Sequence, residues 1–254
     1  MSAGHTHELY RPADTPVHHL PPQCKLVAVL VFVLVVVATP RDQFWAFAVY
    51  ALALCAVAAV AHVPAGVVVR RMTVELPFVA FALLLPFVAS GERVDVLGLS
   101  LSAHGLLGAW NVLAKGTIGV VASILLAATT EPRTLLLGLE RLNMPALIVQ
   151  IMSFMFRYAE VITGEMHRMR IARESRGFQA RDLRQLRAVA QSAGALFIRS
   201  YERGERVHLA MLSRGYAGSM PVVVDVRAGA AQWGAAGLLP LVALVVAVTA
   251  WSLK

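Results

Sequence analysis

Residues 232–253 read QWGAAGLLPLVALVVAVTAWSL, a stretch of 22 residues without a charged side chain. A helix of about 20 apolar residues crosses the roughly 30 Å hydrocarbon core of a bilayer. The whole chain has the same character, because 58% of its 254 residues are hydrophobic and only 15% are charged. A soluble domain carries about 25% charged residues. We therefore expect an all-α, polytopic membrane protein.

Other apolar stretches extend this pattern, and they lie at 26–38, 44–63, 72–90 and 104–128. Together with 232–253 they predict about five transmembrane helices. The expected organisation is an N-terminal cytoplasmic tail at 1–25, transmembrane helices 1–4 at 26–128, a cytoplasmic helical domain at 129–231 and transmembrane helix 5 at 232–254. The first stretch has only 13 uncharged residues, so it either includes residues 21–25 or forms a short helix.

The distribution of arginine predicts the orientation in the membrane. Residues 131–216 contain 14 Arg against 8 Asp or Glu, a balance of +6 out of the net charge of +8. Positively charged segments remain on the cytoplasmic side of a membrane. Placing this segment inside also places Arg70, Arg71 and Lys25 inside and the loop 92–95 outside. We therefore expect a multi-pass protein of the cell membrane with its N-terminus in the cytoplasm.

Lys115 is the unusual residue among the apolar stretches, because it lies about halfway along 104–128. An ionisable residue inside a bilayer is a functional candidate by default. Three interpretations remain open: Lys115 pairs with Glu75, binds a partner subunit, or shows that the span begins later. Glu75 itself lies near a predicted helix end, where an interfacial position is inexpensive.

The histidines and cysteines do not predict a metal or cofactor site. His5, His7, His18 and His19 precede the first apolar stretch, but their spacing defines no site, and we expect them to lie in a mobile tail. Cys24 and Cys55 have no CxxC or Cys/His neighbour that predicts zinc. We interpret both as small apolar packing residues.

The polar domain is expected to contain two long helices. Apolar side chains from Ile148 to Met169 recur at steps of three and four residues, which is typical of one face of an amphipathic helix. This helix is expected at 143–175, with Asn143 as its N-terminal cap and Pro145 in its first turn. The second is expected at 199–213. The apolar residues 186–198 before it are expected to pack on the membrane side of the domain.

Both predicted helices end in the same pattern. Ser175-Arg176-Gly177-Phe178 recurs 38 residues later as Ser213-Arg214-Gly215-Tyr216. One Arg-Gly helix end is an ordinary C-terminal cap, but capping does not require serine and arginine at both. An exposed arginine at a helix tip presents several donors in a fixed fork to a carboxylate of another protein. The repeat therefore predicts a pair of docking tips, made of Ser175, Arg176, Gly177, Ser213, Arg214 and Gly215.

With these tips and five spans, the chain resembles the transmembrane T component of energy-coupling factor (ECF) transporters. The family pattern has alanine where this chain has Ser175 and Ser213, and serine is small enough to preserve a close approach. Residues 17–26 resemble the segment before the first span, and Phe156-Arg157-Tyr158 with Glu165 resembles the middle of the first coupling helix. The N-terminal part is most similar to the cobalt-type (CbiQ-like) branch.

The resemblance implies a non-catalytic scaffold in the lipid bilayer. Two cytoplasmic ABC-type ATPase subunits would each receive one tip, with Arg176 and Arg214 making the contact. A separate substrate-binding membrane subunit would be held by the coupling helices, and cobalt is the implied cargo. The alternatives are a T component for another vitamin or metal ion and, less favoured, a stand-alone membrane transporter.

Other classes of function lack their sequence signals. The chain has no GxxxxGK[ST] loop for nucleotide phosphates and no HExxH pattern, so neither ATP hydrolysis nor a zinc enzyme is predicted. A secondary transporter would need polar pore positions or inverted repeats, and neither is evident. Glutamates and an apolar stripe interleave with the arginines, which favours protein contact over nucleic acid.

Overall fold

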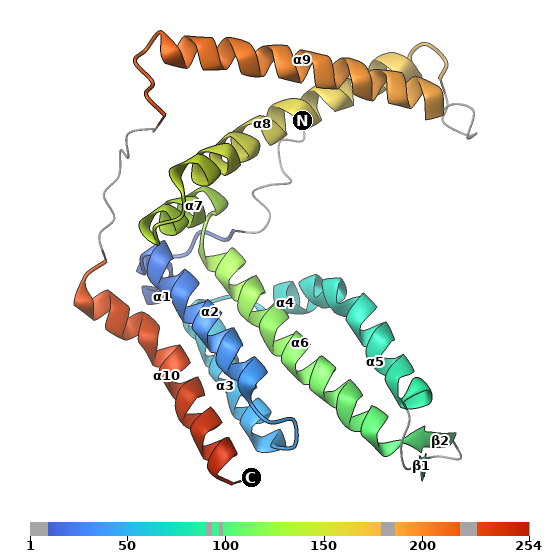
Figure 1. Ribbon diagram of the computed structural model, residues 1–254, viewed down its shortest axis with the longest axis vertical. Coiled ribbons are helices and arrows are strands. Elements are labelled where there is room, and N and C mark those ends of the chain that lie inside the picture. The colour runs from blue at the N-terminus through green and yellow to red at the C-terminus, as the bar shows by residue number, and fades with distance from the viewer. Residues whose placement is uncertain (1–9, 90–92, 97–98, 179–185, 219–227, 254) are drawn as a thin grey trace. The chain divides into compact units, whose positions relative to one another are not determined.

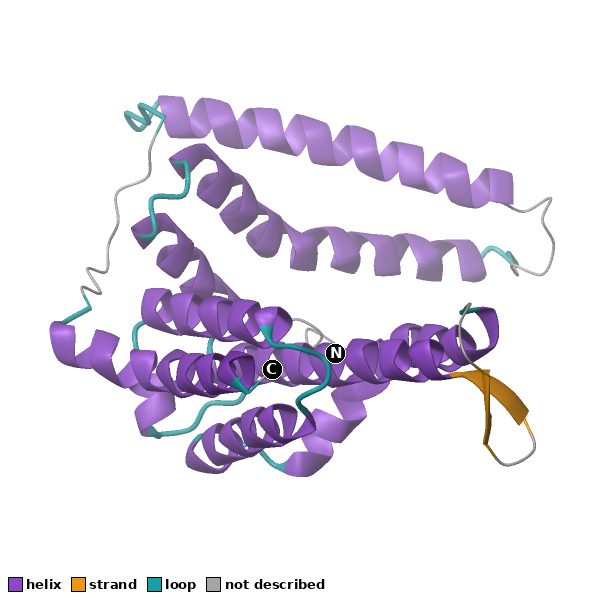
Figure 2. Cartoon of the chain, turned by 60° about the horizontal axis from the view of Figure 1, so that its bottom comes forward, coloured by secondary structure: helices purple, strands orange, loops and turns teal. Residues whose placement is uncertain are grey.

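The computed structural model describes residues 10–89, 93–96, 99–178, 186–218 and 228–253. The chain divides into two compact units, one made of Gly4–Arg141 with Val226–Lys254 and the other of Leu142–Asp225 with Met1–Ala3. Helices dominate both units (Figures 1 and 2). The prediction of a helical, polytopic membrane protein is confirmed.

The first unit, called the membrane unit below, contains most of the apolar helices. Its elements are α1 (Pro16–His19), α2 (Pro22–Ala38), α3 (Phe44–Val60), α4 (Ala65–Arg71), the 3-10 helix η1 (Met72–Glu75), α5 (Leu76–Val88), β1 (Arg93–Val96), β2 (Leu99–Ser102), α6 (Ala103–Thr129), α7 (Pro132–Arg141) and α10 (Ala230–Ser252). The second unit, the coupling-helix unit, contains α8 (Ala146–Glu174) and α9 (Leu186–Leu212).

The loop predicted between the third and fourth spans is a short antiparallel hairpin rather than an irregular connection. Strands β1 and β2 pair in a register that places Arg93 opposite Ser102 and Val96 opposite Leu99. The hairpin, orange in Figure 2, is the one departure from helical structure among the described elements, and it lies between α5 and α6 in the chain.

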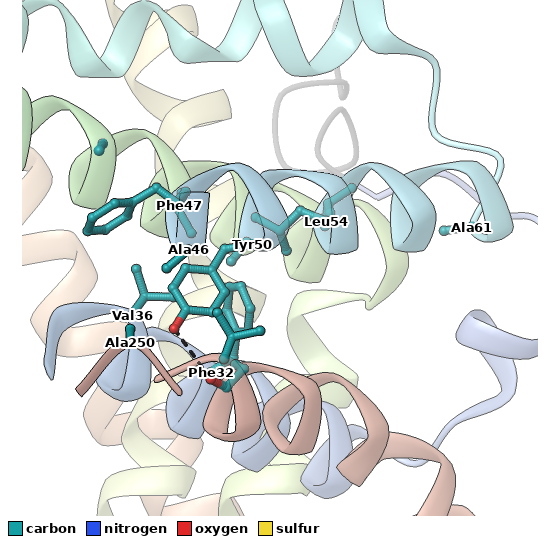
Figure 3. Packing of buried hydrophobic residues seen from close by; sticks show 14 of the residues in the cluster. Phe32, Val36, Ala46, Phe47, Tyr50, Leu54, Ala61 and Ala250 are labelled. Atoms are coloured by element: carbon teal, nitrogen blue, oxygen red, sulfur yellow. Dashed lines mark hydrogen bonds between the residues drawn. The ribbon is translucent and has the colours of Figure 1, made fainter. Parts of the chain in front are cut away.

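The core of the membrane unit lies between α2, α3, α6 and α10, where alanine and aliphatic side chains surround three aromatic residues. Tyr50 of α3 is fully buried, and its ring meets Phe32 of α2 edge-on at 6.0 Å and Phe47 at 6.2 Å between centroids. Figure 3 shows Tyr50 directed toward Phe32 and Val36. A buried phenol needs a polar partner, and the Tyr50 hydroxyl lies 2.9 Å from Thr39 Oγ1 and 3.3 Å from the Ala243 carbonyl of α10.

Four helical stretches in the described part of the chain are long and apolar enough to cross a membrane: Ala65–Val88, Ala103–Thr129, Ala146–Glu174 and Ala230–Ser252. The helices α2 and α3 are also apolar but have only 17 residues each. Helix α2 begins at Pro22, so the first span includes the residues before Leu26. The third begins at Ala65, earlier than expected, because α4 and η1 continue into α5. Helix α8 qualifies by length and composition, so its cytoplasmic position stays a prediction.

The C-terminal end of the short helix α2 is held by side chains from three segments. Thr39 Oγ1 donates to the Val35 carbonyl at 2.9 Å, Lys115 Nζ of α6 to the Val37 carbonyl at 2.7 Å, and Trp251 Nε1 of α10 to the Ala38 carbonyl at 3.3 Å. The last carbonyls of a helix lack partners within the helix, and an unpaired carbonyl in a bilayer costs several kcal/mol. Lys115 therefore serves as a cap for α2.

The interpretation that Lys115 pairs with Glu75 is wrong. Glu75 is buried, and its Oε1 accepts a 2.6 Å hydrogen bond from the hydroxyl of Thr117. Thr117 and Lys115 are two residues apart on α6, so they lie on different sides of the helix. Glu75 thus links η1 to α6, whereas Lys115 caps the C-terminal end of α2.

The expectation of a mobile N-terminal tail is also wrong for His18 and His19, which lie in α1. Lys25 Nζ donates to the His18 carbonyl at 3.2 Å, to the Thr129 carbonyl at 3.0 Å and to Thr130 Oγ1 at 3.2 Å. These bonds tie α1 to the end of α6. His5 and His7 lie outside the described residues. No three His, Cys, Asp or Glu side chains in the described ranges come together to hold a metal ion.

Candidate functional site

The first predicted tip is the C-terminal end of α8, where the chain leaves the helix through a Schellman motif. The Phe178 amide donates to the Arg173 carbonyl at 3.1 Å, and the Gly177 amide donates to the Glu174 carbonyl at 3.0 Å. Gly177 has φ of +77°, a conformation that costs an L-residue with a side chain roughly 1–2 kcal/mol. The predicted glycine cap is confirmed.

The second tip repeats this geometry at the end of α9. The Tyr216 amide donates to the Met211 carbonyl and the Gly215 amide to the Leu212 carbonyl, both at 3.0 Å, and Gly215 has φ of +83°. The same two bonds and the same left-handed glycine therefore close both helices. Arg176 and Arg214 occupy equivalent positions, immediately before the glycine.

The serines that distinguish this chain from the family pattern have a visible role. Ser175 Oγ donates to the Ala172 carbonyl at 3.1 Å, and Ser213 Oγ donates to the Ala210 carbonyl at 3.0 Å. Each hydroxyl satisfies a carbonyl of the last helical turn, which would otherwise need water or another partner. Serine therefore contributes to the closure of each helix end, and the close approach expected from its small size stays a prediction.

The two arginines are available for a partner. Both side chains are exposed, and neither guanidinium has a hydrogen-bond or ion-pair partner within the described ranges. Three or more donors on each guanidinium remain free to meet carboxylate or carbonyl oxygens. That these arginines dock another protein stays a prediction.

Side-chain contacts hold α8 and α9 together in an antiparallel arrangement. Glu165 of α8, whose side chain is 14% exposed, lies 3.4 Å from Arg199 Nη1 and 3.3 Å from Arg203 Nη2 of α9. Closer to the beginning of α8, the Tyr216 hydroxyl donates to Gln150 Oε1 at 2.6 Å. Residue numbers fall along one helix as they rise along the other, so the two tips lie at opposite ends of the pair.

This arrangement separates the tips by about the length of α9. A helix of 27 residues is roughly 40 Å long at about 1.5 Å per residue. The tip of α8 lies beside the beginning of α9, and the tip of α9 lies near the beginning of α8. Two cationic tips at this separation are too far apart to lie in one binding pocket.

Two details of the predicted helices need correction. Helix α9 begins at Leu186 rather than near residue 199, so the apolar residues 186–198 belong to the helix itself. Asn143 does not cap α8, because that helix begins at Ala146 with Pro145 at its N-cap. Asn143 instead has φ of +61° just after α7, and asparagine tolerates this left-handed conformation better than most residues.

The repeat around the tips is longer than the four residues that were predicted. Residues 168–178 read RMRIARESRGF and residues 206–216 read RVHLAMLSRGY. They also share Arg168 with Arg206 and Ala172 with Ala210. The alanines are the carbonyl partners of the tip serines. A search for similarity at the spacing of 38 residues would have found these positions. No such similarity in the sequence indicates the hydrogen bond between Gln150 and Tyr216.

The apolar helices of the membrane unit and the paired tips of the coupling-helix unit define a multi-pass membrane protein with a repeated helix-end motif. This is the class to which the fold and the site assign the chain. The profile of the family described as "Cobalt transport protein" (CbiQ) matches residues 13–223. The chain belongs to this family of membrane transport components.

Individual relatives agree with the family. The "Energy-coupling factor transporter transmembrane protein EcfT" of Thermanaerovibrio acidaminovorans is 30% identical over 231 residues, which cover 83% of this chain and 82% of the relative. The "Cobalt transport protein CbiQ" of Rhodobacter capsulatus is 29% identical over 157 residues, or 59% and 64% of the two chains. An uncharacterized protein of Methanocaldococcus jannaschii is 32% identical over 111 residues, or 43% of this chain and only 41% of the relative.

Proposed function

We propose that this chain is the energy-coupling subunit of an ECF-type ABC importer, linking two cytoplasmic ATPase subunits to a separate substrate-binding membrane subunit. The single observation that supports this most is the repeated tip. Two helices end in the same Schellman geometry, with an exposed arginine at the same place in each. A pair of ATPase subunits would present a pair of sites to match.

In this proposal Arg176 and Arg214 are the ATPase contacts. Ser175, Gly177, Ser213 and Gly215 fix the backbone that presents them. ATP hydrolysis belongs to the partner subunits, and this chain transmits the movement of the ATPase pair to the membrane. The tips must then face the cytosol, which also places residues 129–231 and the N-terminus in the cytoplasm.

The apolar face of α8 is proposed to hold the substrate-binding subunit. Ile151, Met155 and Met166 of the predicted stripe are 51%, 66% and 52% exposed, so packing against α9 does not cover them. Exposed apolar side chains at helical spacing are typical of a surface that another helix covers. The exposed apolar face of α8 is therefore covered by lipid or by a second membrane protein, and we favour the latter.

Cobalt is the proposed cargo. The support is the description of the family and the printed name of the Rhodobacter capsulatus relative, while the EcfT relatives carry no cargo in their names. We assign recognition of the ion to the separate membrane subunit. A T component that serves another metal ion or a vitamin is the alternative.

Co-purification from its native membrane tests the docking role. The unmodified chain is expected to retain ATPase subunits, identified by mass spectrometry, and the Arg176→Ala/Arg214→Ala variant is expected to lose them and to abolish uptake. The matched control is Arg168→Ala/Arg206→Ala, which removes the same charge from the same helices eight residues before each tip. Retention and uptake that are unchanged in the tip variant would refute the proposal.

A further inference from the structure

The two tips share their backbone geometry but differ in the side chains one turn before the arginine. In the 38-residue repeat, Arg173 and Glu174 of α8 correspond to Met211 and Leu212 of α9. The apolar position before them does not distinguish the tips, because Ile171 corresponds to Leu209 and both are exposed, by 51% and 63%. The difference in the residues directly before the tip serine therefore lies in this pair, and further from the tip Arg170 corresponds to His208.

The tip of α8 carries charge around Arg176. Glu174 Oε1 accepts a 2.8 Å hydrogen bond from Arg170 Nε, and the two side chains are 54% and 70% exposed. The Arg173 guanidinium lies 5.7 Å from the centroid of the Phe178 ring. Its Nε and Nη1 atoms are covered and have no hydrogen-bond partner among the described residues. This tip thus carries a net positive charge, because Arg170, Arg173 and Arg176 outnumber Glu174.

The tip of α9 is apolar around Arg214. Leu212 is 48% exposed, directly beside Ser213 and Arg214. Tyr216, the aromatic residue after Gly215, already contacts other side chains of this chain. Its ring packs edge-on against His208 at 6.5 Å between centroids, and its hydroxyl is bonded to Gln150. No acidic side chain occurs from residue 206 to residue 216. The exposed apolar and charged side chains directly before the glycine of this tip are therefore Leu212 and Arg214.

We propose that the two tips hold their ATPase subunits by different forces: charge dominates at the tip of α8, whereas Leu212 enters an apolar pocket at the tip of α9. This inference rests on the docking role proposed above. Attraction between exposed charges weakens with salt, because the Debye length falls from about 10 Å at 0.1 M to about 3 Å at 1 M. Burial of an apolar side chain is not screened in this way.

Two exchanges of the differing pair test the proposal without removing either tip arginine. Arg173→Met/Glu174→Leu gives both tips the apolar pair, and Met211→Arg/Leu212→Glu gives both the charged pair. Each exchange leaves the net charge unchanged. The full chain is purified with its ATPase subunits at 0.1 M salt, and the fraction of ATPase retained after washing at 1 M salt is measured for the unmodified chain and both variants.

The proposal predicts an order of salt sensitivity. At 1 M salt, ATPase retention should fall most for Met211→Arg/Leu212→Glu, by about fivefold or more relative to the unmodified chain. It should fall least for Arg173→Met/Glu174→Leu, because salt screens exposed charges. Equal retention in all three proteins, or the reverse order, would overturn it. If the unmodified chain retains no ATPase at 0.1 M salt, it is the docking role itself that fails. Size-exclusion profiles of the variants alone check that each one folds.

Discussion

The hydroxyl of Tyr216 donates a 2.6 Å hydrogen bond to Oε1 of Gln150, 66 residues earlier in the chain. Tyr216 is the aromatic residue that completes the Schellman motif at the tip of α9, and Gln150 lies one turn into α8. The bond therefore fixes the tip of one coupling helix to the beginning of the other. Phe178, its counterpart at the tip of α8, has no hydroxyl and packs against Arg173 of its own helix.

Replacing Tyr216 with Phe is expected to weaken coupling while docking remains. The change removes one hydrogen bond, worth about 0.5–1.5 kcal/mol, but keeps the ring and the helix cap. We expect less substrate transported per ATP hydrolysed in reconstituted vesicles, with ATPase retention unchanged. Tyr201→Phe, which changes an exposed tyrosine inside α9, is the control. A Tyr216→Phe variant with the transport ratio of the unmodified protein would contradict the positioning role.

Alanine at either tip glycine is expected to disturb the cap. Gly177 and Gly215 have positive φ, and no atom lies within 4 Å of a Cβ added to either. The cost therefore comes from the backbone alone and amounts to roughly 1–2 kcal/mol at each tip. We expect weaker ATPase retention from Gly177→Ala and Gly215→Ala.

Gly204→Ala provides the opposite control for these glycines. Gly204 lies inside α9, also with open space around a Cβ, and alanine is favoured over glycine by roughly 0.5–1 kcal/mol inside a helix. This variant should leave retention unchanged or improve it slightly. A loss equal to that of the tip variants would show that the left-handed backbone is not the cause.

Glu165→Gln is expected to loosen the pair of coupling helices. Glu165 meets both Arg199 and Arg203, but these arginine side chains are 60% and 36% exposed, so solvent screening limits the loss to about 1 kcal/mol. The measurement is hydrogen exchange of the α9 amides, which should become faster. Glu202→Gln is the control, because its pair with Arg206 is exposed and 4.0 Å long. Equal exchange in the two variants would contradict the role of Glu165.

Lys115→Met is expected to destabilise the membrane unit. It leaves the Val37 carbonyl at the end of α2 without its donor, and a backbone carbonyl left without a partner in a bilayer costs several kcal/mol. Thermal unfolding in detergent should occur at a lower temperature for Lys115→Met, while Lys115→Arg, which keeps a cationic donor, should lie between it and the unmodified protein. Identical unfolding temperatures for all three would show that the bond to Val37 contributes nothing.

The sequence predicted the parts of the molecule that depend on local pattern. The length of the apolar stretches predicted the membrane helices. The Ser-Arg-Gly-aromatic repeat predicted both helix ends, because a Schellman cap depends on residues within two turns of one another. The start of α9 was placed too late, because residues 186–198 are apolar enough to suggest a separate packing element. The partners of Lys115, Glu75 and Tyr216 could not be predicted, since each bond joins segments distant in sequence.

Photo-crosslinking at the tips tests the central claim most directly. A photoreactive amino acid is placed at Ser175 or at Ser213, beside the tip arginines, and the protein is irradiated in intact membranes. We expect each position to crosslink to an ATPase subunit, identified by mass spectrometry, while the same amino acid at Arg168 or Arg206 does so far less. Crosslinks at Ser175 and Ser213 to lipid alone, or to proteins on the extracellular side of the membrane, would contradict the account.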